Sequence, residues 1–107
     1  MIVKKVWGEE NILCNEPEYC CKYLYIDPNK KCSLHSHKVK KETFIVKHGT
    51  VNLEHGETKE VLYVGDVRTI LPDTPHRFSS RWGATIIEVS THHDDEDVER
   101  LEPSGEI

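Results

Sequence analysis

Turn-forming residues interrupt this 107-residue chain roughly every 8–12 positions, and this spacing constrains its fold more than any other feature. Glycine, proline, asparagine or aspartate occurs in each interruption, for example at Asp27–Lys30 and Pro72–Pro75. The stretches between them are short and rich in β-branched and aromatic residues. None has a helical period of apolar residues, apart from a turn near Asp94–Leu101. The sequence therefore predicts an all-β fold, either a sandwich or a barrel.

The strands that we expect follow directly from these interruptions. They span Lys4–Trp7, Asn11–Cys14, Tyr19–Ile26, Lys31–His37, Glu42–Lys47, Val51–His55, Lys59–Val64, Val67–Leu71, His76–Ser79 and Ala84–Ser90. Beyond them, Glu102–Glu106 is predicted to be a frayed end, because proline, serine and glycine follow one another there.

The length and the charge distribution limit what the chain can be. Residues 1–107 are enough for one packed core and are predicted to form a single domain. Seven of the 19 acidic residues but only one of the 14 basic residues lie in an acidic tail, at about 94–107. The rest is nearly neutral, which argues against a nucleic-acid partner, because nucleic-acid binding requires a basic face. No apolar run approaches the roughly 20 residues that cross a bilayer, and the first residues lack a signal peptide's apolar region, so we expect a cytoplasmic protein with no membrane partner.

The four cysteines give no sign of a metal or disulfide framework. Cys14, Cys20, Cys21 and Cys32 include an adjacent pair but no CxxC spacing. We therefore expect buried, reduced thiols.

A group of histidines carries the strongest chemical signal. His35 and His37 are one residue apart, so in a strand both side chains point to the same face. Glu42 begins the next expected strand, and a hairpin of this length could bring it beside the two imidazoles. His76 opens a later strand and is the natural fourth member if the sheet closes on itself. Three neutral imidazoles and one carboxylate suit one divalent transition metal such as Zn, Mn, Fe, Ni or Cu, and affinity alone does not choose among them.

The spacing around these residues resembles the two sequence motifs of the cupin superfamily. The first motif is matched by its metal-type residues and final glycine, at His35, His37, Glu42 and Gly49. The second is matched after an interval of 15 residues at Gly65 and His76, with Leu71 and Asp73 at its proline and glycine positions. The resemblance implies a double-stranded β-helix, the cupin jelly roll, with a metal inside the barrel and often a dimeric assembly.

Within that superfamily, the chain is most similar to the cupin domain of type II mannose-6-phosphate isomerases and sugar-nucleotide pyrophosphorylases. The similarity rests on Trp7-Gly8 near the start and on Glu88–Ser90 followed by an acidic segment. Asn29 and Asp73 stand where the superfamily has glycines, and asparagine also adopts the left-handed backbone of a tight turn. The similarity implies a small anionic sugar derivative as the ligand.

The candidate substrate-binding residues are basic, and three of them follow the paired histidines. They are Lys38, Lys40, Lys41, Arg68 and Arg77. At a barrel mouth, the lysines could attract a phosphate or carboxylate, and an arginine could bind it through two hydrogen bonds. The alternative is that the lysines form a solvated turn that keeps the protein soluble.

Glu88 is the candidate catalytic residue. It interrupts the apolar strand Ala84–Ser90, where a carboxylate is costly unless it is paired or protonated. Such a carboxylate would suit a base that moves a proton between adjacent sugar carbons. An edge position or a lysine partner explains Glu88 equally well. For His92 and His93 the sequence leaves open a second metal site or a polar loop.

Three functions from different classes remain open. The first is a metal-dependent isomerase or epimerase acting on a phosphorylated or nucleotide-linked sugar. The second is a metal-dependent dioxygenase, since the same ligands suit Fe(II) or Ni, and the third is a non-catalytic sugar-binding cupin. A homodimer is expected, because a small jelly roll has strand edges to protect and Met1–Trp7 could pair across an interface.

Overall fold

The computed structural model describes all 107 residues, and its regular elements are all β-strands. They are β1 (Ile2–Lys5), β2 (Gly8–Asn15), β3 (Cys20–Ile26), β4 (Lys30–Lys31), β5 (Leu34–Ser36), β6 (Glu42–Gly49), β7 (Val51–His55), β8 (Thr58–Leu62), β9 (Val67–Ile70), β10 (His76–Ser80), β11 (Ala84–Ser90), β12 (Glu99–Glu102) and β13 (Gly105–Glu106). The structure contains no helix with the length and apolar character needed to cross a membrane. The all-β prediction is confirmed.

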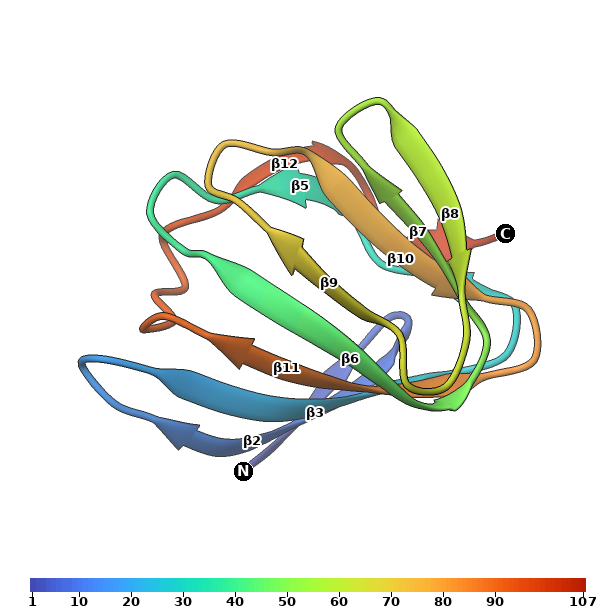
Figure 1. Ribbon diagram of the computed structural model, residues 1–107, viewed down its shortest axis with the longest axis horizontal. Coiled ribbons are helices and arrows are strands. Elements are labelled where there is room, and N and C mark those ends of the chain that lie inside the picture. The colour runs from blue at the N-terminus through green and yellow to red at the C-terminus, as the bar shows by residue number, and fades with distance from the viewer.

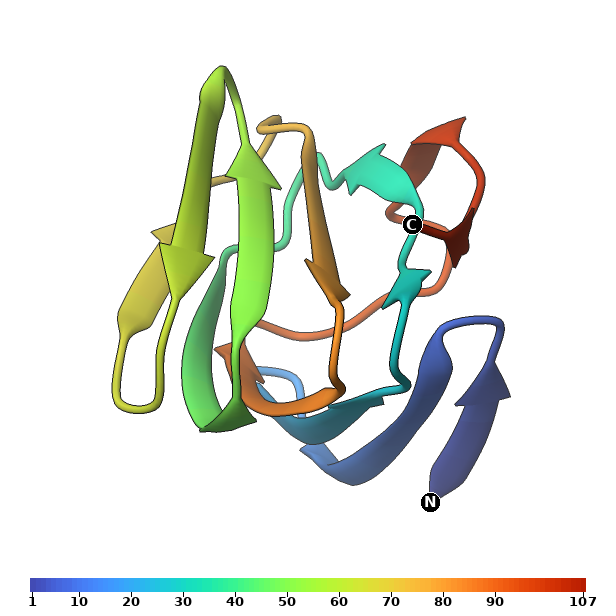
Figure 2. The ribbon, with the colours of Figure 1, turned by 90° about the vertical axis from the view of Figure 1, so that its right-hand side faces the viewer.

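The strands form two antiparallel sheets that enclose a common interior (Figures 1 and 2). One sheet has six strands in the order β1-β2-β3-β11-β6-β9. The other has seven strands, with the path β12-β5-β10-β4-β13 and the β7–β8 hairpin beside β10. Strands that are distant in sequence are thus neighbours, and β11 lies between β3 and β6. This is the double-stranded β-helix that the sequence motifs imply.

Buried and more exposed residues alternate along the strands, and the buried apolar residues form one core. In β11, for example, Ala84 and Ile86 are buried, whereas Thr85 and Ile87 are half-buried. Thirteen buried apolar side chains form a single cluster: Trp7, Leu24, Ile26, Cys32, Phe44, Val46, Val51, Leu53, Leu62, Ile70, Phe78, Ala84 and Ile86. Trp7 packs edge-to-face on Phe78 with 4.9 Å between the ring centroids. Such burial is worth roughly 1.5–3 kcal/mol for each large side chain and holds the two sheets together.

Backbone conformation explains several turn residues. A Cβ atom at Gly8 would lie 1.8 Å from the carbonyl oxygen of Tyr25, so only glycine fits after Trp7. Asn29 and Asp73 have φ angles of 61° and 62°, which places both in the left-handed region. The expectation that Asn29 can serve as a glycine there is confirmed.

Three predictions about the strands are wrong. The expected strand Lys4–Trp7 lies earlier in the chain, as β1, because Val6 and Trp7 form the tight turn in which Lys5 pairs with Gly8 of β2. The expected strand Lys31–His37 is divided into β4 and β5, because Cys32 and Ser33 leave the ladder between them. The expected frayed end at Glu102–Glu106 is instead part of the second sheet, where β12 pairs with β5 and β13 pairs with β4. The acidic tail therefore packs on the barrel, since β4 and β5 offer free edges that it can pair with.

Candidate metal centre

The interior of the barrel changes from apolar to polar at the same level in adjacent strands. Along β11 the inward residues run from Ala84 and Ile86 to Glu88, which is buried. On β3, the Cα partner of Glu88 is Lys22, which is also buried, and on the other side of β11 strand β6 begins with buried Glu42. One end of the barrel is thus filled by the core, and the other end holds a buried polar site.

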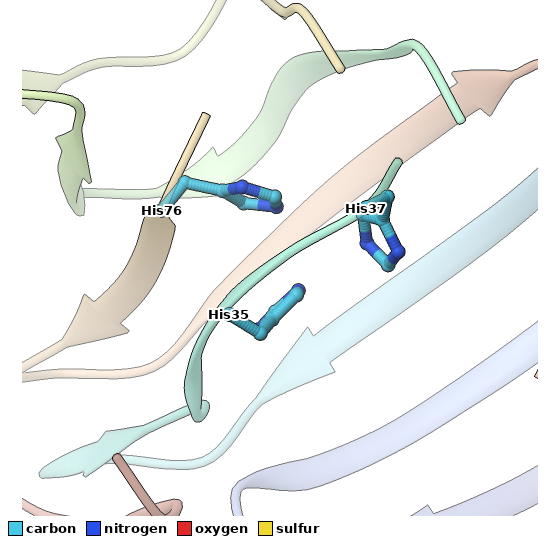
Figure 3. Close-up of side chains that lie close together, drawn as sticks. All are labelled: His35, His37 and His76. Atoms are coloured by element: carbon cyan, nitrogen blue, oxygen red, sulfur yellow. The ribbon is translucent and has the colours of Figure 1, made fainter. Parts of the chain in front are cut away.

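Three histidines meet at this polar end. His35 lies in β5, His37 directly follows that strand, and His76 opens β10 as the cross-strand partner of His35. One ring nitrogen from each lies within 4.8 Å of the other two, and Figure 3 shows the three rings gathered at one place. His37 and His76 are buried and His35 is half-buried. Such a triad could hold a metal ion.

Each imidazole is oriented by a backbone carbonyl group. In all three rings Nδ1 donates a hydrogen bond, and the acceptors are the carbonyl oxygens of Ser33 for His35 at 2.8 Å, Asp97 for His37 at 2.5 Å and Thr74 for His76 at 2.8 Å. A neutral ring therefore carries its proton on Nδ1 and has the Nε2 lone pair available for a metal. Metal-binding histidines are commonly fixed in this way, by a second hydrogen bond that sets the tautomer and the ring direction. Without a metal, burial would lower the pKa of His37, but the contact with Glu42 and the hydrogen bond to the Asp97 carbonyl raise it, and Nε2 of the protonated ring forms an ion pair with Glu42.

Glu42 completes the group. Its carboxylate oxygens lie 3.2 Å from Nε2 of His37 and 3.6 Å from Nε2 of His76. Burial would raise the pKa of the Glu42 carboxyl, but the contacts with both histidines and with Lys40 hold it well below its usual value. Burial and the neighbouring His76 lower the pKa of His35 to about 4, so this ring is neutral at pH 7.

The donor set fits a divalent transition metal. Three buried side-chain atoms have no hydrogen-bond partner of suitable geometry. One is Oε2 of Glu88, which lies 2.8 Å from the ammonium nitrogen of Lys40, and the two at this centre are Nε2 of His76 and Oε2 of Glu42. Buried polar atoms are normally satisfied, so these two atoms point to a missing positive partner. Neutral imidazoles and one carboxylate supply the nitrogen and oxygen ligands that such ions accept.

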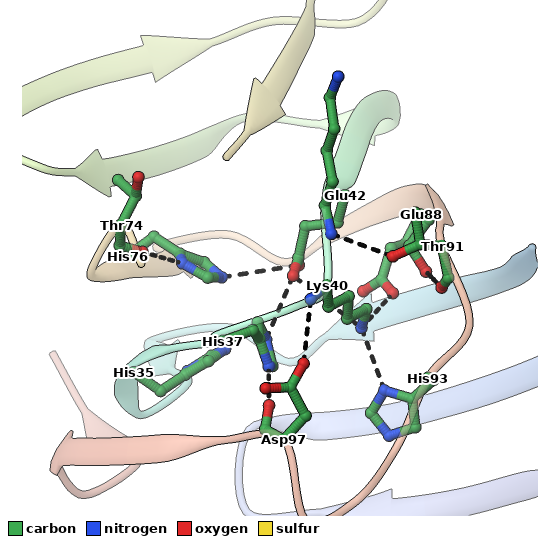
Figure 4. Close-up of polar contacts among 12 residues, drawn as sticks. His35, His37, Lys40, Glu42, Thr74, His76, Glu88, Thr91, His93 and Asp97 are labelled. Atoms are coloured by element: carbon green, nitrogen blue, oxygen red, sulfur yellow. Dashed lines mark hydrogen bonds and ion pairs between the residues drawn. The ribbon is translucent and has the colours of Figure 1, made fainter. Parts of the chain in front are cut away.

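A second polar group adjoins the first (Figure 4). Nζ of Lys40 lies 2.8 Å from Oε2 of Glu88, 3.9 Å from Oε2 of Glu42 and 3.1 Å from Nδ1 of His93. His93 in turn reaches the exposed carboxylate of Asp95 through Nε2, at 2.8 Å. Burial would lower the pKa of Lys40, but Glu88 and Glu42 outweigh it and raise that pKa, so the ammonium group stays charged. Lys40 thus bridges the carboxylate beside the histidines and the candidate base.

A cavity of about 350 Å³ joins the two groups. His35, His37 and Glu42 line it together with Lys40, Glu88 and His93, and Trp7, Leu24 and Phe78 give it apolar walls. Its basic residues are Lys4, Lys5, Lys22, Lys40 and Arg100, and its acidic residues are Glu10, Glu42, Glu88 and Asp95. A volume in this range is typical of a site for a small molecule.

The structure brings some of the predicted site residues together and separates others. The four predicted metal ligands are adjacent, and Lys40 and Glu88 line the same cavity as a pair. The other predicted substrate-binding residues do not line it: Lys38, Lys41, Arg68 and Arg77. Lys38 and Lys41 belong to an exposed turn, which agrees with the alternative of a solvated turn. Arg68 pairs with Glu60 at 3.0 Å, and Arg77 is buried against the C-terminal segment.

Sequence reasoning missed four of the five basic residues that line the cavity: Lys4, Lys5, Lys22 and Arg100. A signal for Lys22 exists, because it alternates in phase with Cys20 and Leu24 and so had to point inward. Arg100 has no such local signal, since its position depends on how the C-terminal segment packs. For His93 the sequence left open a second metal site or a polar loop, and in the structure this residue lines the cavity beside Lys40.

Comparisons with known proteins agree with this architecture. The family described as "Mannose-6-phosphate isomerase C-terminal" matches residues 1–103. A comparison of the sequence with curated proteins finds no match.

Three solved structures illustrate the similarity of fold. An RmlC-like cupin from Shewanella frigidimarina has a TM-score of 0.82 and 16% identity, over 90% of this chain and 86% of that one. KdgF from Halomonas sp. has a TM-score of 0.75 and 18% identity, over 82% of this chain and 81% of that one. Oxalate decarboxylase from Bacillus subtilis has a TM-score of 0.84 and 14% identity, over 94% of this chain but only 30% of the longer protein. At these identities the similarity concerns the fold.

Proposed function

Because this chain belongs to the mannose-6-phosphate isomerase C-terminal family of cupins, we propose that it is a metal-dependent isomerase or epimerase of a small anionic sugar derivative. The observation that carries the proposal is the set of three imidazoles, each fixed through Nδ1 by a backbone carbonyl, beside the buried carboxylate of Glu42. His35, His37, His76 and Glu42 would hold one divalent ion. A bound ion of this kind polarises a carbonyl or hydroxyl oxygen as a Lewis acid.

Glu88 is the candidate for moving a proton between adjacent carbons of the sugar. Its carboxylate lines the cavity and is nearly inaccessible to bulk water. A buried carboxylate with few solvent contacts can take a proton from carbon and return it to the neighbouring carbon before it exchanges away. The ammonium group of Lys40, 2.8 Å from Oε2 of Glu88, stabilises the ionised carboxylate before the transfer.

The charges around the cavity favour an anionic ligand. Five basic residues line it against four acidic ones, and a divalent ion would add two further positive charges. Lys5 and Arg100 are exposed, line the cavity and form no ion pair within the chain. They are therefore free to bind a phosphate or carboxylate group, and Arg100 offers the forked geometry that suits such a group. These two residues replace Lys38 and Lys41 as the proposed anion contacts.

The experiment begins with chelated protein reloaded with Zn, Mn, Fe(II) or Ni. Each form is incubated in D₂O with a panel of aldose and ketose phosphates and sugar acids, and products are followed by NMR. We expect one class of anionic sugar to be interconverted, with deuterium incorporated only in part at the carbon that gains a proton, because Glu88 is buried and returns much of the proton it removed. Glu88→Gln should lower turnover by roughly 10²–10⁴-fold at unchanged metal content, because it removes the base and leaves the metal ligands intact.

Glu60→Gln is the matched control, since Glu60 is a carboxylate that does not line the main cavity. Turnover by Glu88→Gln at the wild-type rate would remove Glu88 from the reaction. Oxygen consumption by the Fe(II) form without isomerisation would favour the dioxygenase alternative. Stoichiometric binding of a sugar with no turnover would favour the non-catalytic alternative.

A further inference from the structure

Asp97, in the C-terminal segment 91–107, contacts the loop His37–Lys40, which leads to Glu42, through both its backbone and its side chain (Figure 4). Its carbonyl oxygen accepts the hydrogen bond from Nδ1 of His37 at 2.5 Å. Its carboxylate accepts hydrogen bonds from the backbone N–H groups of Lys38 at 2.8 Å, Val39 at 3.2 Å and Lys40 at 3.0 Å. One residue, 60 positions after His37, thus orients that imidazole and fixes the turn that leads to Glu42.

The same segment also contacts the other half of the site. β12 pairs with β5, and Arg100 is the Cα partner of His35 in that ladder. His93 contacts Nζ of Lys40 at 3.1 Å. The segment therefore touches the strand, the loop and the buried lysine that surround the proposed metal ligands.

We propose that Asp97 is a positioning residue for the metal centre, and that packing of the segment 91–107 on the barrel is coupled to metal binding. This inference rests on the metal centre of the proposed function and does not depend on the reaction. When the segment is released, His37 loses its Nδ1 acceptor and the turn Lys38–Lys40 loses the acceptor for three N–H groups. The imidazole and Glu42 then have more conformations to lose on binding a metal, which lowers the affinity.

Coupling of this kind must be reciprocal. If release of the segment weakens metal binding by a given factor, metal binding must oppose release of the segment by the same factor. The two effects can be measured separately on the same protein.

The first measurement is the affinity of the metal-free protein for Zn²⁺ or Mn²⁺ by calorimetry. We expect Asp97→Ala to weaken binding by roughly 10–100-fold, the range for loss of a group that orients a ligand. Asp97→Asn keeps one neutral carbonyl oxygen as an acceptor, and its metal affinity should fall between those of Asp97→Ala and the wild type. Glu96→Ala is the matched control, because it removes a neighbouring exposed acidic side chain that forms no hydrogen bond or ion pair, and it should bind like the wild type.

The second measurement uses the wild-type chain and so does not depend on the folding of a variant. Hydrogen exchange is followed at the amides of Lys38, Val39 and Lys40 with and without saturating metal. We expect the metal to slow these amides by about 10–100-fold, in line with the calorimetric loss. The amide of Tyr63 is the control, since it donates to the carboxylate of Asp66 at 2.8 Å in a turn that does not line the cavity, and its exchange should not change.

Two results would overturn the inference alone while leaving the metal centre in place. They are wild-type metal affinity in Asp97→Ala, and unchanged exchange at the three amides in a protein that has bound the metal. If the wild-type chain binds no metal, both the inference and the proposed function are wrong.

Discussion

At the scale of single residues, the direction of each imidazole is set before any ligand arrives. In His35 and His37, Nδ1 donates a hydrogen bond to a backbone carbonyl and Nε2 faces the common centre.

Replacing both rings removes two of the four proposed ligands, and we expect His35→Ala/His37→Ala to lose stoichiometric metal. Elemental analysis after reloading and dialysis measures this. The control is His48→Ala/His92→Ala, in which two exposed imidazoles are removed, and it should keep about one ion per chain. Equal metal contents in the two double variants would contradict the assignment.

The thiols differ in burial, and their reactivity should differ accordingly. Burial raises the pKa of Cys32 to about 12, and its Sγ also accepts the N–H of Phe78 at 3.3 Å. Cys20 is buried as well, whereas Cys14 and Cys21 are half-buried cross-strand partners. The expectation of buried, reduced thiols therefore holds for two of the four, and all four are free.

We expect a disulfide reagent at pH 8 to modify Cys14 and Cys21 in the folded protein and to spare Cys20 and Cys32. The thiolate is the reactive species, and a thiol of pKa about 12 is ionised only about once in 10⁴ molecules at that pH. Mass spectrometry after a timed quench identifies the labelled residues, and denaturant should expose all four. Labelling of Cys32 in the folded protein as fast as Cys14 would show that this part of the core opens readily.

At the scale of elements, the sequence predicts what is local and misses what is distant. β7 and β11 agree residue for residue with expectation, because their alternation and their flanking turns are both contained in the sequence around them. β12 and β13 are missed, because each pairs with a strand more than 60 residues earlier and neither has a buried face to produce alternation.

The same distinction applies to the site. His35 and His37 could be predicted to share a face because strand geometry requires it. Proximity in sequence to the paired histidines does not show which lysine lines the cavity. Lys38 and Lys40 are two positions apart, and only Lys40 is buried. Asp97, from a segment with no local signal, fixes the turn that contains both lysines, and within that turn only the side chain of Lys40 reaches the buried carboxylate of Glu88.

Arg77 joins three elements, and its removal should lower stability. Its guanidinium donates hydrogen bonds to the carbonyl oxygens of Cys32 and Pro103, each at 2.9 Å, and to Oε1 of Glu102 at 3.0 Å. Arg77→Met keeps much of the apolar stem but leaves the buried carbonyl of Cys32 without this donor, and it removes two hydrogen bonds to acceptors of the exposed C-terminal segment. We expect the free energy of unfolding, measured with denaturant, to fall by about 1–3 kcal/mol.

The matched control is Arg68→Met, which removes a half-buried surface arginine paired with Glu60. Solvent screens that pair, so the free energy of unfolding should change little. Equal losses in the two variants would show that Arg77 contributes no more than a surface ion pair.

At the scale of the whole molecule, the two faces of the six-stranded sheet have different surroundings. The inner face covers the core and the polar site. The outer face carries a row of largely apolar side chains across four neighbouring strands, in which Tyr23, Ile87, Ile45 and Val67 are successive cross-strand partners. Tyr25 and Val89 extend this face and are exposed. Monomeric proteins rarely leave an extended apolar patch in water, so this face favours a protein partner.

We expect that partner to be a second copy of the chain, which makes the protein a homodimer through this face. The N-terminal strand is a weaker candidate, since β1 already pairs with β2 of its own chain and offers only its outer edge. Sedimentation of the metal-loaded protein at micromolar concentration should give twice the mass of one chain.

Ile45→Glu/Ile87→Glu should sediment with the mass of one chain, because two carboxylates in each copy would be buried without partners at the interface. Its metal content should not change, since both side chains point away from the cavity. Val61→Glu/Val64→Glu, at exposed apolar positions in and near β8, should remain dimeric. A wild-type protein that sediments as a monomer would contradict the dimer, and a dimeric Ile45→Glu/Ile87→Glu variant would move the interface elsewhere.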